Sequence, residues 1–522
     1  MNISEMLARN AGMYPDESAL IELRPSGNER TAISWKEFDE QANRVANALI
    51  ASGIEKDDKV IHWMMNSIDW LTAYFGIIRT GAWAVPLNFR FSESDLQYCA
   101  SIAEAKGMIL GEEFTERVEA ARPHMETIKD YLFVGKTLPV GMSDLKATMN
   151  QSSPDPVEIT LDTEDPCGLY FTSGTTGAPK PILLTHRNME SAAVTENRSH
   201  EITHEDNFIL IPPLYHAGGK MHWFGSLIVG GKATILAEIS PKKVFDAVHN
   251  ERGTVVFQLV PWTQDILGAL DRGELKKDDY DLSCWRLMHM GAQPIPPSVV
   301  KRWKEYFPGM QYDTTYGLSE STGPGCVHLG IENEHKVGAI GKAGIDWETR
   351  IVNDNGEDVT PGETGELLVK GGGVMKEYYK NPEKTAETIR DGWLYTGDIA
   401  RVDDEGFIYL VDRKKDVIIT GGENIYPVEV EDALRNYPGI YDVAVIGVPD
   451  ERLGEIVAAV IDPNPDTTLT KDEINEFCAQ NLPRYKRPRR IFFDKVPRNP
   501  TGKLEKPKLR EKYAGQKESF KL

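Results

Sequence analysis

One stretch of the chain concentrates groups that bind phosphate. It reads Thr172-Ser173-Gly174-Thr175-Thr176-Gly177-Ala178-Pro179-Lys180. Its glycines allow backbone N–H groups to turn toward an anion, and its hydroxyls and ammonium group add side-chain donors. Apolar runs at 167–171 and 182–184 predict a strand on each side. Taken alone, the pattern is more typical of a turn between strands than of a polyphosphate site, so other parts of the chain must decide.

The length and charge of the chain limit its fold and its partners. With 522 residues, 40% of them hydrophobic, it is expected to form at least two globular domains. A net charge of −21 argues against nucleic acid or an anionic membrane surface as a partner. The scattered cysteines suit a reducing compartment, and no apolar run is long enough to span a bilayer. We therefore expect a cytoplasmic protein without an integral membrane segment.

Strands and helices alternate before residue 346. The periodicity predicts helices over 38–50 and 70–80. Strands are predicted over 59–64, 81–87, 208–211, 233–236, 255–260 and 287–290. This alternation is typical of an α/β fold with parallel or mixed sheets and helices between them.

The pattern changes after Asp346. Short strands separated by turn clusters predict a small antiparallel sheet or β-barrel. Five consecutive charged residues at 412–416 then precede a segment long enough for a compact α+β unit. We expect a large N-terminal lobe over residues 1–414 and a small, mobile C-terminal domain over residues 415–522, with a hinge at Lys415.

Further motifs follow the phosphate-binding stretch in order. They are Tyr316-Gly317-Leu318-Ser319-Glu320, Tyr395-Thr396-Gly397-Asp398, Asp412-Arg413 and Pro500-Thr501-Gly502-Lys503. Together with residues 172–180, they resemble the ordered signatures of the adenylate-forming family. That family includes acyl-CoA synthetases, peptide-synthetase adenylation domains and firefly-type luciferases. Motifs in register are far more specific than one glycine-rich loop, so we interpret the loop as an ATP site.

The resemblance implies a reaction in two steps. A carboxylate attacks the α-phosphorus of ATP, which releases pyrophosphate and leaves an acyl adenylate, and the thiol of coenzyme A then displaces AMP. Both steps place negative charge on reactants that are already anionic, so the protein must position them and supply positive charge. ATP, Mg²⁺ and coenzyme A are the implied cofactors and substrates.

The resemblance also assigns roles at the ATP site. The β- and γ-phosphates would lie against Thr172, Ser173, Gly174, Thr175, Thr176, Gly177 and Lys180. Glu320 would hold Mg²⁺, a hard cation that prefers oxygen ligands. The rest of the nucleotide would contact Gly291, Ala292, Gln293, Thr315, Tyr316, Gly317, Ser319, Asp398 and Arg413. Among these, Tyr316 and the 291–293 segment would enclose adenine, and Asp398 and Arg413 would hydrogen-bond the ribose.

Lys503 receives the central catalytic role, because the corresponding family lysine bridges the attacking carboxylate and the α-phosphate. The alternative is an exposed lysine in a basic tail. For the second step, the C-terminal domain would turn about Lys415, since a few residues at an element boundary can absorb such a change. The candidate CoA-binding residues are Gly421, Gly422, Glu423 and Arg484. The basic strip from 484 to 490 is equally consistent with a solvated positive face.

His216 stands where amino-acid-activating relatives carry an aspartate that neutralises the substrate ammonium, so amino acids are disfavoured. It resembles the gate residue of fatty and aryl acyl-CoA synthetases, and a hydrogen-bonded core histidine is the alternative. The other candidate acyl-pocket residues are Gly218, Gly219, Trp262, Met290 and Gly291. They suit a medium-chain, branched, alicyclic or aromatic acid. Lys220 could pair with a second carboxylate, but we expect its ammonium group to extend to solvent.

The leading function is therefore an AMP-forming acyl-CoA synthetase that acts on a small-molecule carboxylic acid. A ligase that delivers its adenylate to a carrier-protein thiol is the second hypothesis. A non-catalytic nucleotide binder is the third, and the presence of both Glu320 and Lys503 disfavours it. A homodimer is one possible assembly.

Substitution of Lys503 by alanine separates its two interpretations. We expect Lys503→Ala to lose acyl-adenylate formation by orders of magnitude while it still forms thioester from supplied acyl adenylate, because the lysine acts only on the first step. Each half-reaction is measured separately, with Lys495→Ala as the control from the same basic tail. Equal loss of both half-reactions would refute the assigned role.

Overall fold

The structure is a computed structural model of the chain that describes residues 1–172, 179–293, 295–465, 467–498 and 504–514. It forms two compact units. One consists of Met1–Thr349 and Val369–Leu394, and the other of Arg350–Leu368 and Tyr395–Leu522. The division at residue 415, with a mobile C-terminal domain, stays a prediction.

A mixed sheet in the first unit carries the strands beside the phosphate loop, in the order β19-β9-β8-β4-β3-β5-β6-β7. Its strands are β3 (Lys59–Trp63), β4 (Trp83–Pro86), β5 (Gly107–Gly111), β6 (Asp130–Val134), β7 (Ser143–Asp144), β8 (Pro166–Thr172), β9 (Lys180–Thr185) and β19 (Glu377–Tyr378). Strands β3, β4, β5 and β8 are parallel. Strand β9 returns antiparallel to β8, so that Thr172 lies opposite Lys180. The predicted strands on both sides of the loop are confirmed.

A second sheet of the first unit runs in the order β16-β15-β14-β13-β12-β10-β11-β1-β2. Its strands are β1 (Ser18–Arg24), β2 (Glu29–Ser34), β10 (Asn207–Leu210), β11 (Lys232–Leu236), β12 (Val255–Gln258), β13 (Leu287–Met290), β14 (Gln311–Leu318), β15 (Gly323–His328) and β16 (Lys342–Ala343). The central strands β10 to β13 are parallel and buried on both faces, which explains their nearly continuous apolar sequence.

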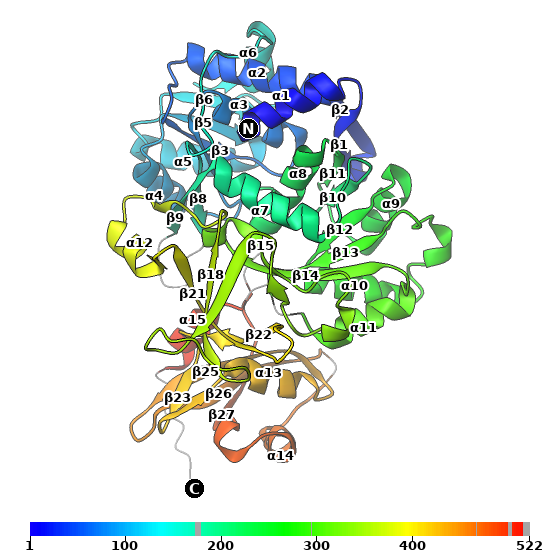
Figure 1. The fold of residues 1–522 in the computed structure, drawn as a ribbon, viewed down its shortest axis with the longest axis vertical. Coiled ribbons are helices and arrows are strands. Elements are labelled where there is room, and N and C mark those ends of the chain that lie inside the picture. The colour runs from blue at the N-terminus through cyan, green and yellow to red at the C-terminus, as the bar shows by residue number, and fades with distance from the viewer. Residues whose placement is uncertain (173–178, 294, 466, 499–503, 515–522) are drawn as a thin grey trace. The chain divides into compact units, whose positions relative to one another are not determined.

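Helices cover both faces of this second sheet (Figure 1), with α7 and α8 on one face and α9, α10 and α11 on the other. The helices of the first unit are α1 (Ile3–Met13), α2 (Trp35–Ala51), α3 (Ile68–Arg79), α4 (Glu93–Ala103), α5 (Thr115–Ala121), α6 (Leu145–Gln151), α7 (His186–Ser199), α8 (Ala217–Val229), α9 (Pro241–Glu251), α10 (Val260–Asp271), α11 (Pro297–Tyr306) and α12 (Pro382–Thr388). Capping boxes begin α2 at Ser34 and α7 at Thr185, where side chains satisfy backbone N–H groups. In the described part of the chain, none of the helices has the length and apolarity needed to cross a bilayer.

A curled antiparallel sheet follows residue 346, as the turn-rich sequence predicts. It contains β17 (Trp347–Val352), β18 (Thr364–Gly371), β20 (Ile389–Arg390), β21 (Trp393–Val402) and β22 (Ile408–Arg413). The chain passes from one unit to the other within β17, β18 and β21. An α/β fold with a curled sheet is therefore confirmed.

The end of the chain forms the predicted α+β arrangement. Its sheet runs in the order β24-β23-β26-β25, with β27 paired to β26. The elements are β23 (Ile418–Thr420), β24 (Glu423–Ile425), α13 (Pro427–Arg435), β25 (Ile440–Asp450), β26 (Gly454–Pro463), α14 (Lys471–Asn481), β27 (Arg490–Phe493) and α15 (Lys506–Tyr513). A core of aliphatic side chains from these strands and helices holds them together.

Buried charges fix α15 within the second unit. Lys506 is 6% exposed and its Nζ lies 2.8 Å from Glu431 Oε1, which also accepts a hydrogen bond from Val445 N at 2.8 Å. Burial raises the pKa of Asp412 to about 6, and the charge of Lys506 partly offsets this increase. Because α15 begins soon after residue 503, these contacts hold the chain on the C-terminal side of Lys503.

Loss of this buried cation should destabilise the second unit. We expect Lys506→Met to lower the free energy of unfolding by up to about 3–5 kcal/mol, because it removes the cation nearest the buried Glu431 and leaves Arg435, whose Nη2 lies 3.6 Å from Glu431 Oε2. Urea denaturation, with hydrogen exchange of α13 and α15 to locate the change, measures the effect. Lys508→Met, which removes an exposed lysine, is the control, and Lys506→Met combined with Glu431→Gln should recover much of the loss. Equal effects of Lys506→Met and Lys508→Met would contradict the assignment.

Candidate active site

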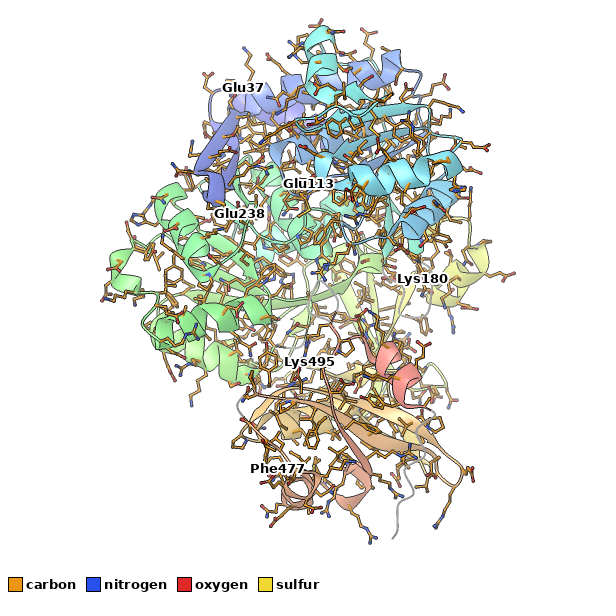
Figure 2. All side chains as sticks on the ribbon, turned by 180° about the vertical axis from the view of Figure 1, so that it is seen from behind. Glu37, Glu113, Lys180, Glu238, Phe477 and Lys495 are labelled. Carbon is orange, nitrogen blue, oxygen red and sulfur yellow. The ribbon has the colours of Figure 1, made fainter. Side chains whose placement is uncertain are left out.

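The predicted phosphate-binding stretch, residues 172–180, is described at its two ends. Residues 173–178, which include Ser173, Gly174, Thr175, Thr176 and Gly177 of the predicted site, lie outside the described residues. Thr172 ends β8 and Lys180 begins β9, and the two are cross-strand partners. The Nζ of Lys180, labelled in Figure 2, lies 5.7 Å from the centre of the Tyr378 ring. The antiparallel pairing of β9 with β8 therefore fixes the position of the Lys180 backbone.

Tyr378 connects the lysine to the predicted magnesium ligand. Its hydroxyl donates a hydrogen bond of 2.7 Å to Glu320 Oε1. Burial and the neighbouring carboxylate raise the pKa of Tyr378, so its hydroxyl stays protonated as a donor. Tyr378 is held in place because β19 pairs with β9, with Tyr378 opposite Ile182. This tyrosine was not predicted from the sequence, because it belongs to no motif and only strand pairing brings it to Glu320.

The backbone around Glu320 is also held by the segment before Tyr378. Met375 N donates to Glu320 O at 2.8 Å, and Thr322 Oγ1 donates to Gly373 O at 2.6 Å. Thr322 has a left-handed backbone with φ of 71°, which a β-branched residue rarely adopts. The turn that carries Ser319 and Glu320 is therefore fixed by tertiary contacts.

The predicted adenine-binding residues lie at the carboxyl ends of two neighbouring strands. Gly291, Ala292 and Gln293 follow β13, and Thr315, Tyr316 and Gly317 lie on β14. These strands are parallel with Met290 beside Thr314, so both segments leave the sheet at the same edge, where open α/β sheets bind ligands.

Two features of the 291–293 segment suggest a binding role. Ala292 has a φ of 69°, a strained conformation that persists where the surrounding structure enforces it. The Oε1 atom of Gln293 is buried without a hydrogen-bond partner among the described residues. This oxygen is an acceptor to which an amino group of a bound molecule could donate.

The predicted ribose residues meet within the second unit. Asp398 on β21 and Arg413 on β22 are cross-strand partners, and Arg413 Nε lies 3.4 Å from Asp398 Oδ1. The Asp398 side chain is 10% exposed, whereas that of Arg413 is 38% exposed. The structure thus brings together two residues that the sequence analysis assigned to the same sugar.

The predicted hinge and CoA-binding residues lie on turns of the second unit. Lys415 is exposed in the turn between β22 and β23. Gly421 and Gly422 form the two-residue turn between β23 and β24, with φ of 59° and 89°, values that this type of hairpin turn requires. Glu423 begins β24 and is exposed. These positions leave the hinge and CoA roles as predictions.

Two of the basic residues between 484 and 490 already have partners within the protein, so fewer of them are free to bind phosphate than the sequence implies. Arg484 lies in the short helical turn η7 (Arg484–Lys486) and is exposed. Lys486 pairs with Glu429, and Arg487 donates from Nε to Leu482 O at 2.8 Å and from Nη2 to Ala479 O at 2.9 Å. Arg487 therefore satisfies carbonyl groups at the end of α14, which is a structural role.

Lys503 itself lies outside the described residues, but the chain beside it is anchored. Arg498 and Leu504 form an antiparallel bridge. The guanidinium of Arg498 makes two hydrogen bonds to Asp442, at 2.6 and 2.8 Å. A bidentate pair of this kind fixes both position and orientation. The catalytic role of Lys503 stays a prediction.

The predicted acyl-pocket residues cluster at the start of α8 and the end of β13. His216 caps α8, since its Nδ1 accepts a hydrogen bond from Gly218 N at 3.3 Å. Trp262 is half-buried in the first turn of α10, and Met290 is buried. A Cβ atom on Gly219 would lie 2.4 Å from Pro213 O, so this glycine is required by close backbone packing.

Phe257, on β12, lies beside two of the predicted acyl-pocket residues and was not predicted from the sequence. A Cβ atom on Gly218 would lie 2.8 Å from Phe257 Cε1, and one on Gly291 would lie 3.2 Å from Phe257 Cε2. One aromatic ring therefore fills the space beside both glycines. Phe257 lies in an apolar strand, so the sequence alone could not distinguish it from an ordinary core residue.

The expectation that Lys220 extends to solvent is wrong. Lys220 is 2% exposed, and its Nζ lies 4.3 Å from the centre of the Tyr170 ring. Desolvation lowers its pKa to about 7, although nearby Cys167 acts in the opposite direction. Helix α8 is buried on nearly all sides, so a lysine at this position has no path to the surface.

Comparisons with known proteins cover nearly the whole chain. The family model described as AMP-binding enzyme matches residues 7–379, and the AMP-binding enzyme C-terminal domain matches residues 429–503. The chain is 34% identical to a feruloyl-CoA synthase of an Amycolatopsis species, over 97% of this chain and 98% of the relative. It is 32% identical to the long-chain-fatty-acid–CoA ligase FadD13 of Mycobacterium tuberculosis, over 98% and 99% of the two chains. It resembles the crystal structure of ATP-bound MatB from Rhodopseudomonas palustris with a TM-score of 0.87, at 28% identity over 99% of each chain.

The buried amine of Lys220 should make stability depend on pH. Its pKa is about 7 in the folded chain and near 10.5 when unfolded, so between these values the unfolded chain binds more protons and stability rises with pH. We expect the free energy of unfolding to rise by up to about 1.4 kcal/mol per pH unit above about pH 7, and Lys220→Met to remove this slope. Urea denaturation at a series of pH values checks this, with Lys301→Met, an exposed lysine, as control. An unchanged slope in Lys220→Met would contradict the assignment.

Proposed function

Since this chain belongs to the family of AMP-binding enzymes and is an AMP-forming carboxylate–CoA ligase, we propose that its substrate is a compact acid with an aromatic or alicyclic ring. The observation that carries this choice is the position of Phe257. Its ring occupies the space beside Gly218 and Gly291, the small residues that would otherwise lengthen the acyl pocket. A pocket that ends on an aromatic ring suits a short, ring-bearing acid better than a long flexible chain.

The relatives support both a ring-bearing acid and a fatty acid. One relative is named for feruloyl-CoA, an aryl acid derivative, and another is named for long-chain fatty acids, at nearly equal identity. Phe257 therefore provides the argument for the aryl or alicyclic class. The medium-chain and branched acids that the sequence also allows become outcomes of the test.

The adenylation step is assigned to charges in the first unit and to Lys503. Lys180 and the stretch before it bind the β- and γ-phosphates. Glu320 fits a magnesium ion, because a carboxylate is a hard oxygen ligand and Tyr378 occupies only its Oε1 atom among the described residues. When bound, Mg²⁺ supplies positive charge to the pyrophosphate leaving group. Lys503 stabilises the negative charge that develops between the acid and the α-phosphate.

Nucleotide orientation is assigned to polar groups with matching chemistry. The unpartnered Oε1 of Gln293 accepts a hydrogen bond from the adenine amino group, while Tyr316 packs against the ring. Asp398 accepts hydrogen bonds from the ribose hydroxyls and Arg413 donates to the same sugar. His216, at the N-terminus of α8, borders the acid. Thiol transfer follows rotation of the C-terminal domain about Lys415, which brings Gly421 and Gly422 to the thiol arm of coenzyme A.

A panel of acids tests this function directly. We expect pyrophosphate release to depend on the acid and to be fastest with aryl or alicyclic acids, and coenzyme A to convert the product into AMP and a thioester. Acid-dependent release without thioester on addition of coenzyme A would favour transfer to a carrier-protein thiol instead. Release that no acid stimulates would favour a nucleotide binder and would overturn the proposal.

Phe257 gives a sharper test of substrate class. We expect Phe257→Ala to shift the ratio of kcat/KM values toward longer acids by about 10-fold or more, because a binding surface that fits one more methylene gains about 1–3 kcal/mol for each. Phe257→Leu, which keeps most of the volume, is the matched control and should shift the ratio much less. A ratio unchanged in Phe257→Ala would place the acid elsewhere, and since it is a ratio, partial loss of folded enzyme does not affect it.

A further inference from the structure

A cluster of histidines and carboxylates lies buried in the first unit, and none of its members is assigned to the adenylation chemistry. Its members are Glu196 and His200 of α7, His222 of α8, His289 of β13, Asp313 of β14 and His328 of β15. All are at most 6% exposed. Helices α7 and α8 pack against each other and against β15. The cluster therefore joins helices and strands that are far apart in the sequence.

One nitrogen of each of three histidines faces the same carboxylate oxygen. Glu196 Oε1 lies 3.1 Å from His289 Nδ1, 3.9 Å from His200 Nδ1 and 3.9 Å from His222 Nε2. The His289 Nδ1 and His222 Nε2 atoms are 3.1 Å apart. Glu196 and His200 are four residues apart on α7, a spacing that places both on one face of a helix.

The other nitrogen of each histidine has a hydrogen-bond partner. His200 Nε2 lies 2.7 Å from Asp313 Oδ2, and His222 Nδ1 donates to Gly218 O at 2.6 Å. His289 Nε2 lies 2.8 Å from Thr315 Oγ1. A carboxylate, a carbonyl group and a hydroxyl thus orient the three rings. Metal-binding histidines typically have such partners on the nitrogen that faces away from the metal.

The two buried carboxylates of the cluster, Asp313 and Glu196, differ in their hydrogen bonds. Asp313 accepts hydrogen bonds from His200 at 2.7 Å, from His328 at 3.2 Å and from Gly330 N at 2.9 Å. Both carboxylate oxygens of Glu196 are buried without a hydrogen-bond partner among the described residues. An unpartnered buried carboxylate is costly, so Glu196 requires either a proton or a cation.

We propose that Glu196, His200, His222 and His289 bind a Zn²⁺ ion. A tetrahedral ion with bonds of about 2.0–2.1 Å separates its ligand atoms by about 3.3–3.4 Å. The three distances from Glu196 Oε1 and the distance from His289 to His222, which range from 3.1 to 3.9 Å, bracket this value. The nitrogen and carboxylate ligands suit zinc and similar first-row metals. Four protein ligands fill the tetrahedron, so the ion is structural and joins α7, α8 and β13.

Metal analysis of the full chain tests this site. Protein treated with a chelator is loaded with Zn²⁺, freed of excess by gel filtration and analysed for bound metal. We expect about one zinc per chain in wild type and loss of that zinc in Glu196→Gln and His200→Gln, since each variant removes a ligand. His62→Gln is the control, because His62 is a buried histidine of β3 outside the cluster. Wild type that retains no zinc, or variants that retain it fully, would overturn the proposal.

Cobalt bound to the wild-type protein provides a second readout, and its absorption spectrum does not depend on the folding of variants. Co²⁺ in wild type should give the strong visible absorption of a tetrahedral ion, and Zn²⁺ should displace it. Zinc should also raise the Tm of wild type and not that of His222→Gln. Weak octahedral absorption of Co²⁺ would mean that Glu196 carries a proton and that bound metal is adventitious. These readouts do not involve the ligase reaction, so they are independent of the proposed substrate.

Discussion

The hydrogen bond between Tyr378 and Glu320 is the constraint on which the candidate active site depends. Tyr378 belongs to β19, which pairs with β9, and β9 begins at Lys180. Strand β9 therefore positions both residues: it begins with Lys180, the lysine assigned to the phosphates, and it pairs with the strand whose Tyr378 holds Glu320, the glutamate assigned to the metal. For reactions of polyphosphates, the protein contributes mainly position and charge, and a common strand edge for both residues is what the proposed chemistry requires. The contacts of Met375 and Thr322 with the same turn add to it.

The first unit combines this polar edge with a large number of buried ionisable groups. Lys220, the histidine cluster and Glu196 all lie in its interior, and Lys220, His222 and His289 are close in sequence to residues assigned to the acid or the nucleotide. Two of the cluster's outer hydrogen bonds end on such residues, namely the carbonyl of Gly218 and the hydroxyl of Thr315. Groups that fix the cluster thus also fix the backbone where acid and adenine are expected to bind. Buried hydrogen bonds, as well as apolar packing, therefore hold the interior of this unit in place.

The sequence was most informative where function is carried by contiguous residues. The strand predicted at 287–290 is β13. Asp398 and Arg413 come from two separate motifs and are cross-strand partners, while their shared role at the ribose stays a prediction. Tyr378 and Phe257 could not be predicted, because strand pairing and a contact with two glycines give them their roles. Lys220 was misjudged because a long charged side chain usually reaches solvent, whereas α8 is covered on nearly all sides. The histidine cluster, like Tyr378, could not be predicted from the sequence, because its members come from separate helices and strands that only the fold brings together.

The interleaving of the two units has a consequence for recombination between related genes. The chain leaves the first unit after Thr349, returns at Val369 and leaves again after Leu394. A single crossover at 349 or 368 would take Tyr378 from a different parent than Glu320. One at 394 would separate Glu366 from Lys414 and from Gly397 N, to which it is joined at 3.1 Å in each case. Exchange of the C-terminal half between homologues therefore preserves both sets of contacts only when the 350–368 segment is transferred with it.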